Sequence, residues 1–271
     1  MTENEQREFD DLLVHIYSIC GYDLRNYSLP SMQRRFARFR GADPKLDYQS
    51  IKEKIQNEPA YLDKLLLALA VSTSSIFRDP ALFAELRNTV LPQLKNKTLR
   101  VWSAGCSSGE EAYSIAILLR EEGFADHFRI YATDVNEQLL QRAVKGVYPL
   151  HSMQTYTNNY LSSGGHADFS TYYTCAYGKV IFHESLRRNI TFAQHNLAVD
   201  GSFNEFDLIF CRNVLIYFNP ALQELVHKLL FDSLVSNGVL ALGDKESLAF
   251  STFRRSYKQI APGKRLFRKT D

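Results

Sequence analysis

From residue 99 onward, the sequence repeats a pattern in which short apolar runs alternate with stretches of helical character. The runs are LRVWSAG from residue 99, FRIYATD from 128, FDLIFCRN from 206 and GVLALGD from 238. Short apolar runs separated by helices are typical of a largely parallel sheet that helices cover on both faces. The pattern therefore predicts an α/β fold for this part of the chain.

Before residue 99, the apolar residues follow a helical spacing instead. The first helix is indicated by four residues that fall on one face, Phe9, Leu12, Leu13 and Ile16. Three more helices are predicted over residues 31–40, 48–55 and 62–69, and Ser31 is the expected N-cap of the second helix. We expect a helical domain over residues 1–88 and the α/β domain over residues 89–271.

An insert at about residues 158–182 interrupts the α/β pattern. Two serines and two glycines at 162–165 precede the aromatic-rich run DFSTYYTCAYGKV. Tyrosines and β-branched residues between turn formers favour strands. A small β-hairpin or subdomain is predicted here.

Composition and cysteine spacing limit the class of protein. Hydrophobic residues make up 45% and charged residues 23% of the 271, as in soluble globular proteins, and no apolar run is long enough to span a bilayer. The four cysteines lie far apart and show no metal-ligand spacing. We therefore expect a cytoplasmic monomer with reduced thiols, without a metal and not embedded in a membrane. The net charge of +2 does not favour nucleic acid as a partner.

The segment 101–113 reads as a strand, a small-residue loop and the start of a helix. Gly105 and Gly109 allow the backbone to turn sharply and to approach a ligand closely. Glu110 and Glu111 stand in the first helical turn, where they suit the helix dipole but would repel a pyrophosphate. A ligand with a positive centre fits better, and S-adenosylmethionine carries a sulfonium and an ammonium group.

A further acid, Asp134, ends the next predicted strand. Ligands of open α/β sheets lie beyond the carboxyl ends of the strands, where such an acid accepts hydrogen bonds from ribose hydroxyls. The alternative interpretation is that Asp134 caps the following helix, because Asp is a favoured N-cap.

Four motifs carry a resemblance to a known family: FRDP at 77–80, GEEAYSIA at 109–116, ATDVNEQLLQRAVKGVYP at 132–149 and CRNVLIYF at 211–218. In this combination and order, over about residues 9–268, the chain resembles the CheR-type chemotaxis receptor methyltransferases. The resemblance implies a Rossmann-like methyltransferase sheet with an N-terminal helical domain and a small β-subdomain. It also implies methyl transfer from S-adenosylmethionine to glutamates on the helical bundle of a chemoreceptor, with S-adenosylhomocysteine as the second product.

The resemblance also assigns roles to individual residues. Arg78 and Tyr217 match residues near the methyl-transfer site. The implied cofactor contacts are Ser72, Ser74, Arg78, Ala104, Gly105, Glu111, Asp134, Asn196, Leu197, Arg212 and Asn213. Arg34, Arg35 and Arg38, on a helix with no acid, match the part that docks on the acidic receptor. The insert matches a subdomain that grips a receptor tail in some members.

Departures from the family pattern indicate a divergent branch. Ser72 and Ser74 stand where the family has Asn and Thr, Ala112 replaces a proline, and the late GHSE motif reads GDKE at 243–246. Two alternatives stay open: a methyltransferase for nucleic acid or a small molecule, and a non-catalytic module that binds the cofactor or docks a partner. Individual residues also have alternative roles. Arg78 could pair with Asp79 or with a helix end, Tyr217 could be a core residue, and the basic helix could simply be exposed to solvent.

Overall fold

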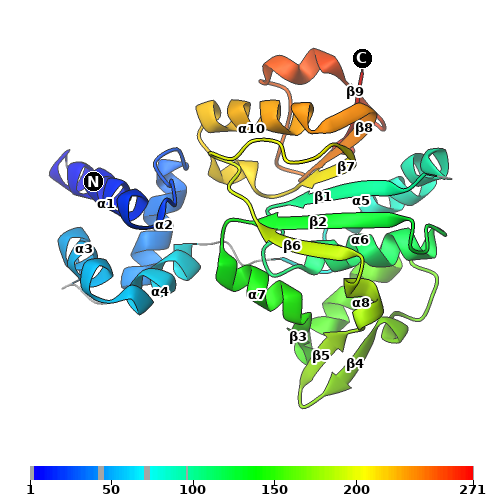
Figure 1. Ribbon diagram of the computed structural model, residues 1–271, viewed down its shortest axis with the longest axis horizontal. Helices are drawn as coiled ribbons and strands as arrows, with labels where there is room; N and C mark the ends of the chain where they lie inside the picture. The colour runs from blue at the N-terminus through cyan, green and yellow to red at the C-terminus, as the bar shows by residue number, and fades with distance from the viewer. Residues whose placement is uncertain (1–2, 42–45, 70–73, 96, 271) are drawn as a thin grey trace. The chain divides into compact units, whose positions relative to one another are not determined.

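The computed structural model describes residues 3–41, 46–69, 74–95 and 97–270, and the chain forms two compact units (Figure 1). The first unit comprises Met1–Val71 and Ile216–Leu225, and the second comprises Ser72–Leu215 and Val226–Asp271. The division after Val71 differs from the boundary at residue 88 expected from the sequence. Its cause is α5 (Pro80–Glu85), which buries Leu82 and Phe83 in the core of the second unit.

Over residues 3–41 and 46–69, the first unit is built from α1 (Glu3–Cys20), α2 (Leu29–Arg40), α3 (Tyr48–Asn57) and α4 (Pro59–Leu69). The four predicted apolar residues of α1 are buried, and they pack with Met32 and Phe36 of α2. The predicted start of α2 at Ser31 is wrong. Ser28 is the residue before the helix, Pro30 lies in its first turn, and Ser31 is buried within it, because proline is well suited to a first helical turn.

The second unit is built on a seven-stranded sheet in the order β6-β2-β1-β7-β8-β10-β9. Five neighbouring strands are parallel: β6 (Ile190–Gln194), β2 (Phe128–Asp134), β1 (Leu99–Ala104), β7 (Phe206–Cys211) and β8 (Leu234–Leu242). β10 (Leu266–Lys269) is antiparallel to β8 and to β9 (Tyr257–Gln259). The associated helices are α6 (Glu110–Glu121), α7 (Glu137–Lys145), α9 (Glu184–Arg187) and α10 (Pro220–Asp232). The predicted α/β fold is confirmed.

A second, three-stranded sheet follows α7. Its order is β3-β5-β4, with β3 (Val147–Pro149), β4 (Tyr173–Ala176) and β5 (Lys179–Phe182), all antiparallel to their neighbours. The β4–β5 hairpin lies inside the predicted insert, whereas β3 precedes it. Between β3 and β4 runs α8 (Met153–Ser162).

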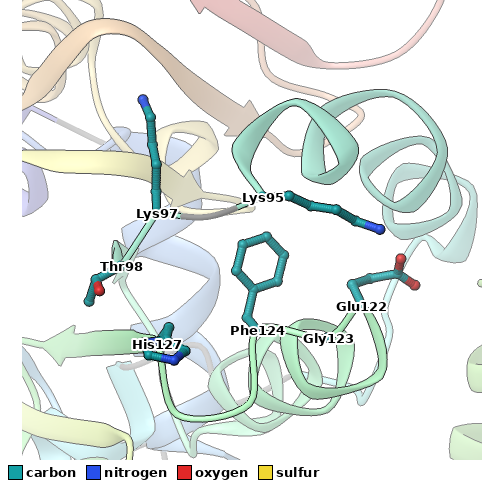
Figure 2. A pocket seen from close by; sticks show the side chains of 7 residues that line it. All are labelled: Lys95, Lys97, Thr98, Glu122, Gly123, Phe124 and His127. Carbon is teal, nitrogen blue, oxygen red and sulfur yellow. The ribbon is translucent and has the colours of Figure 1, made fainter.

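The two edges of the large sheet carry different features. The loops after β1, β2, β6 and β7 leave the carboxyl edge. At the opposite edge, where β1 and β2 begin, lies a pocket of about 460 Å³ lined by Lys95, Lys97, Phe124 and His127, among others (Figure 2). Ligands of open parallel sheets bind at the carboxyl edge, so this pocket is not the candidate site.

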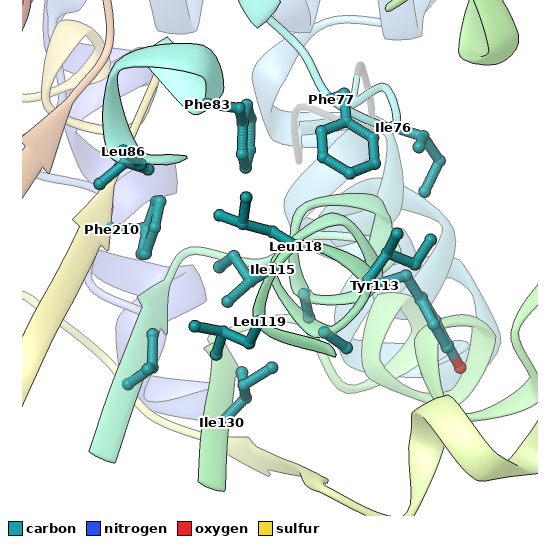
Figure 3. Close-up of a cluster of buried hydrophobic side chains, with 14 of the residues drawn as sticks. Ile76, Phe77, Phe83, Leu86, Tyr113, Ile115, Leu118, Leu119, Ile130 and Phe210 are labelled. Carbon is teal, nitrogen blue, oxygen red and sulfur yellow. The ribbon is translucent and has the colours of Figure 1, made fainter. Parts of the chain in front are cut away.

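The main core lies between one face of the sheet and the helices α5, α6 and α8. Figure 3 shows Ile115, Leu118 and Leu119 of α6 between the strands on one side and the rings of Phe77 and Phe83 on the other. On the other face, the Trp102 ring packs against Phe203 and Phe206, with centroids 5.2 Å and 5.3 Å away. Within the described part of the chain, no helix has the length and apolar character needed to cross a membrane.

Candidate functional site at the carboxyl edge of the sheet

The parallel register brings four loops to one place. β1 and β2 end side by side, with Ala104 opposite Thr133, and β6 ends beside β2, with Gln194 opposite Asp134. β7 pairs with β1 on its other side. Seven of the predicted cofactor contacts therefore lie in or next to adjoining loops at this edge, although they come from separate parts of the sequence. They are Ala104, Gly105, Asp134, Asn196, Leu197, Arg212 and Asn213.

The loop after β1 is held by the end of β2. The backbone N–H groups of Gly105 and Cys106 both donate to the Thr133 carbonyl at 2.8 Å, and the Ser107 N–H donates to Asp134 Oδ2 at 2.9 Å. Gly105 adopts φ 78°, and a Cβ there would lie 2.5 Å from Val214 Cγ2. A glycine is therefore required at 105, and the loop after β7 closes directly over it.

Asp134 stabilises this loop and has bonding capacity left. Its two carboxylate oxygens accept N–H groups of Ser107 and Asn136, both at 2.9 Å. Burial raises its pKa, against these hydrogen bonds. The N-cap of α7 is Asn136, whose side chain accepts from the Leu139 N–H, so the interpretation of Asp134 as that cap is wrong. The Val135 N–H also bonds to this carboxylate, and of its four lone pairs one is left for a ribose hydroxyl.

The two glutamates at the start of α6 have different surroundings. Glu110 is buried and accepts hydrogen bonds from Ser108 Oγ at 2.8 Å and from the side chains of Ser74 and Tyr156. Burial raises the pKa of Glu110. Glu111 accepts from Ser103 Oγ at 2.8 Å and from Arg212 Nη1 at 3.0 Å. Glu110 therefore faces the protein interior, and the expectation that both acids face a cationic ligand needs correction.

Arg212 joins three segments of the site. Its side chain is only 2% exposed. Nη1 pairs with Glu111, and Nη2 donates at 2.8 Å both to Asp79 Oδ2 and to the Arg78 carbonyl. Because two carboxylates share one guanidinium, the three side chains carry a net charge of −1. Arg212 thus acts as a tie between α6, the turn at Arg78 and the loop after β7.

Arg78 lies in a strained turn. Its neighbours Phe77 and Asp79 have φ values of 48° and 55°, a region that costs non-glycine residues about 1 kcal/mol or more each. The Phe77 N–H donates to Ser114 Oγ at 2.8 Å, and the Phe77 ring is fully buried. Asp79, the proposed alternative partner of Arg78, pairs with Arg212. The turn is therefore fixed on both sides of Arg78, whose side chain is half-buried.

Of the two predicted serines, Ser74 lies in the described part of the chain. Ser74 is half-buried, and its hydroxyl hydrogen-bonds to Glu110, so it supports the start of α6. Ser72 lies outside the described residues. The structure thus links the departure at Ser74 to the buried Glu110.

The loop after β6 adjoins Asp134. The His195 N–H donates to the Asp134 carbonyl at 3.2 Å, and the His195 ring packs against Trp102, which agrees with a structural role. Asn196 forms a turn in which its Oδ1 accepts the Ala198 N–H at 3.0 Å. Asn196 and Leu197 are half-buried at this edge.

Tyr217 belongs to the first unit, together with the basic helix α2. The Tyr217 carbonyl accepts the Ser28 N–H at 2.7 Å, and its ring lies under the guanidinium of Arg35 at 4.3 Å. Arg35 is buried and donates to the Leu69 carbonyl, so its assignment to receptor docking is wrong. Arg34 and Arg38 are exposed, as docking requires.

One residue of the site has no place in the predictions. Glu246, in the turn after β8, accepts four backbone N–H groups, three of which belong to the loop after β7. The spacing Gly-x-x-Glu in the GDKE segment was the available signal. As for metals, no cluster of three His, Cys, Asp or Glu residues that suits an ion is found within residues 3–41, 46–69, 74–95 and 97–270.

Comparisons with known proteins bear on this edge. Residues 72–261 match a family described as "CheR methyltransferase, SAM binding domain". A Pseudomonas putida protein named putative methyltransferase Cher3 is 44% identical over 268 residues, 98% of each chain. A chemotaxis protein methyltransferase of Listeria monocytogenes is 32% identical over 231 residues, which cover 84% of this chain and 85% of the relative.

Other matches are partial. An uncharacterised 104.1 kDa protein of Rhodobacter capsulatus is 31% identical over 269 residues, and the chain spans 27% of its length. Among solved structures, the N-methyltransferase NodS of Bradyrhizobium japonicum with S-adenosylhomocysteine has 17% identity and a TM-score of 0.35, covering 72% of this chain and 71% of that one. The StiE O-MT structure of residues 942–1257 has 13% identity and a TM-score of 0.38, covering 79% and 58%. Both structural likenesses are too weak to bear on the site.

Proposed function

Because the chain belongs to the CheR family of S-adenosylmethionine-dependent methyltransferases, we propose that it methylates glutamate side chains of a chemoreceptor or a related signalling protein, giving glutamyl methyl esters. The observation that carries the proposal is the tie through Arg212, which holds the turn of Arg78 next to the cofactor loops. The relatives named chemotaxis protein methyltransferases support the receptor as target.

The described residues of the carboxyl edge fit the cofactor. Gly105 allows close approach of the backbone, Asp134 retains a lone pair for a ribose, and the Glu111–Arg212–Asp79 group has a net charge of −1. When bound, S-adenosylmethionine supplies a methyl group on a positively charged sulfur. A negative, half-buried site favours such a cation over a phosphate-bearing ligand. Asn196 and Leu197 complete the edge beside Asp134.

The acceptor needs little from the protein chemically. A glutamate side chain is already ionised at neutral pH, so no general base has to remove a proton. Arg78 neutralises and orients the incoming carboxylate, and Tyr217 orients it through a hydrogen bond. Holding the acceptor in line with the methyl group lowers the activation barrier by several kcal/mol in enzymes, as judged from the effective molarities of well-oriented intramolecular reactions.

The first unit supplies the surface for the partner. Arg34 and Arg38 are exposed on α2, which contains no acid, so they create a positive field that attracts an acidic helical bundle in the cytoplasm. The β4–β5 hairpin has an open edge at β4, which lies at the end of its sheet. We assign the helical unit to docking and this edge to gripping a receptor tail.

The test uses radiolabelled S-adenosylmethionine with receptor-containing membranes. Label that enters the receptor and leaves in mild alkali indicates a carboxyl methyl ester. Arg78→Ala and Tyr217→Phe should reduce transfer much more than they reduce cofactor binding. Alkali-resistant label would exclude a glutamyl ester, and cofactor binding without transfer to any receptor would favour a non-catalytic module.

A further inference from the structure

The Glu246 carboxylate lies at the centre of a set of backbone hydrogen bonds. Its side chain is buried, with the residue 3% exposed. Oε2 accepts the N–H groups of Gly243 at 2.7 Å and Asn213 at 2.9 Å. Oε1 accepts those of Val214 and Leu215, both at 2.8 Å. Three consecutive amides after β7 are thus bound to one carboxylate from the turn after β8.

This arrangement suits a carboxylate and excludes an amide. Each oxygen of an ionised carboxylate accepts two hydrogen bonds, so four donors match its capacity. Hydrogen bonds to an ionised acceptor are also about twice as strong as neutral ones. A glutamine would keep one oxygen and turn its NH2 group toward two N–H donors.

The backbone around Glu246 leaves little room for change. A Cβ on Gly243 would lie 2.8 Å from Glu246 Oε2 and 2.9 Å from the Asn213 backbone nitrogen. Asn213 itself adopts φ 61°, a conformation that asparagine tolerates better than most residues other than glycine. Asp244 and Lys245, between the two fixed residues, are exposed. The differences from the GHSE motif therefore fall where the structure tolerates them.

The loop that Glu246 holds forms part of the candidate site. Arg212, which ties Glu111 and Arg78 together, comes directly before it. Val214 lies against Gly105, since a Cβ on that glycine would reach Val214 Cγ2 at 2.5 Å. A shift of this loop would therefore move the tie and uncover the loop after β1.

We propose that Glu246 is a positioning residue: its carboxylate fixes the backbone of residues 213–215 so that Val214 closes over Gly105 and Arg212 keeps its place at the cofactor site. Glu246 acts through this loop and does not touch the reacting groups. The inference rests on the proposed function only in placing S-adenosylmethionine at this edge.

The experiment compares Glu246→Gln with wild type and with Asp244→Asn as the matched surface control. S-Adenosylhomocysteine binding is measured by calorimetry, and amide hydrogen exchange is followed in the protein without cofactor. Loss of one or two charge-assisted hydrogen bonds predicts binding about ten- to a hundredfold weaker in Glu246→Gln. Exchange should accelerate at residues 213–215 and 243 while β1 and β2 stay protected. Asp244→Asn should match wild type, and Glu246→Asp, which keeps the charge, should fall between.

Two results would overturn the proposal. One is binding within about twofold of wild type in Glu246→Gln, a change below the loss of a single such hydrogen bond. The other is faster exchange spread equally over β1 and β2, which would indicate a general loss of stability. If Glu246→Gln does not fold, Gly243→Ala displaces the same loop with the carboxylate intact, and unchanged binding in that variant would also refute the role. No methyl acceptor is present, so a failure here is separate from a failure to methylate glutamate.

Discussion

The guanidinium of Arg35 stacks over the ring of Tyr217, with its central carbon 4.3 Å from the ring centroid. Both residues lie in the first unit, although Tyr217 follows the last residues of β7 closely in sequence. Next to it in the chain, Phe218 packs edge-on against Tyr27 of the same unit, with ring centroids 5.0 Å apart. The basic helix α2 therefore contains two kinds of arginine, an inward one that contacts the tyrosine and outward ones that are free to meet a partner.

Replacing Arg35 with leucine should lower kcat for receptor methylation with little change in the KM for the receptor. A cation over a ring shielded from water contributes about 2 kcal/mol, which corresponds to about thirtyfold in rate if it is all used in the transition state. Initial rates over a range of receptor concentrations measure both constants. Arg34→Gln is the matched control, because the exposed neighbour should raise KM, increasingly at low salt, and leave kcat unchanged. A higher KM with unchanged kcat in Arg35→Leu would contradict a role for Arg35 through the Tyr217 ring.

A second prediction concerns a buried ionic cluster near the small sheet. Arg87 of η1 (Leu86–Val90) pairs with Glu121 and Glu122, and the hydroxyls of Tyr160 and Tyr172 donate to Glu121. Burial, with the bond to Glu121, raises the pKa of Tyr160 to about 12. Glu121→Gln leaves Arg87 partly uncompensated and should lower the free energy of unfolding by about 3 kcal/mol or more.

Urea unfolding monitored by circular dichroism measures this loss. The exposed i,i+4 pair of Lys228 and Asp232 supplies the control, and Asp232→Asn should change the free energy of unfolding by about 0.5 kcal/mol or less. Binding of S-adenosylhomocysteine should be kept in Glu121→Gln below the unfolding transition. Equal losses in the two variants would show that the Arg87 cluster is not a significant source of stability.

A third prediction is a pH dependence from Glu110, whose pKa is raised by burial from its ordinary value of 4.5. In the pH range above 4.5 the folded state then holds a proton that the unfolded state has lost, so Glu110 lowers stability as the pH rises through its folded pKa. Glu110→Gln stays neutral. The stability advantage of wild type over this variant should therefore be largest at low pH and shrink with rising pH, by about 1.4 kcal/mol per unit of pKa shift.

Unfolding measured at several pH values tests the sign. Asp47 provides the opposite case, because its hydrogen bond with Ser50 lowers its pKa. Asp47→Asn should lose stability relative to wild type as the pH rises through the ordinary range of an aspartate. Parallel slopes for the two variants would mean that burial does not raise the pKa of Glu110.

The sequence predicted the sheet and the loops at its edge because both follow from local pattern. Short apolar runs separated by helices indicated parallel strands, and the ends of such strands share an edge, so Gly105 and Asp134 were expected together, whereas Asn213 was assigned only by the family resemblance. The orientation of single side chains could not be predicted in this way. Whether Arg35 points inward depends on Tyr217, a residue distant in sequence, and Glu246 acquires its role only when β7 and β8 become neighbours. Glu110 and Glu111 look equivalent in sequence and differ only in what packs against them.

The last prediction tests the close contact between Gly105 and Val214. Gly105→Ala places a Cβ 2.5 Å from Val214 Cγ2 and adds the cost of φ 78° for alanine, about 1–2 kcal/mol. Val214→Ala removes the clashing methyl group but leaves the backbone cost. The double variant should therefore bind S-adenosylhomocysteine more tightly than Gly105→Ala alone, with a coupling energy of about 1–3 kcal/mol. Calorimetry on the four proteins of the cycle gives that value. Additive effects in this cycle would mean that the loop after β7 does not close over the glycine loop, and the proposed role of Glu246 would then fail with it.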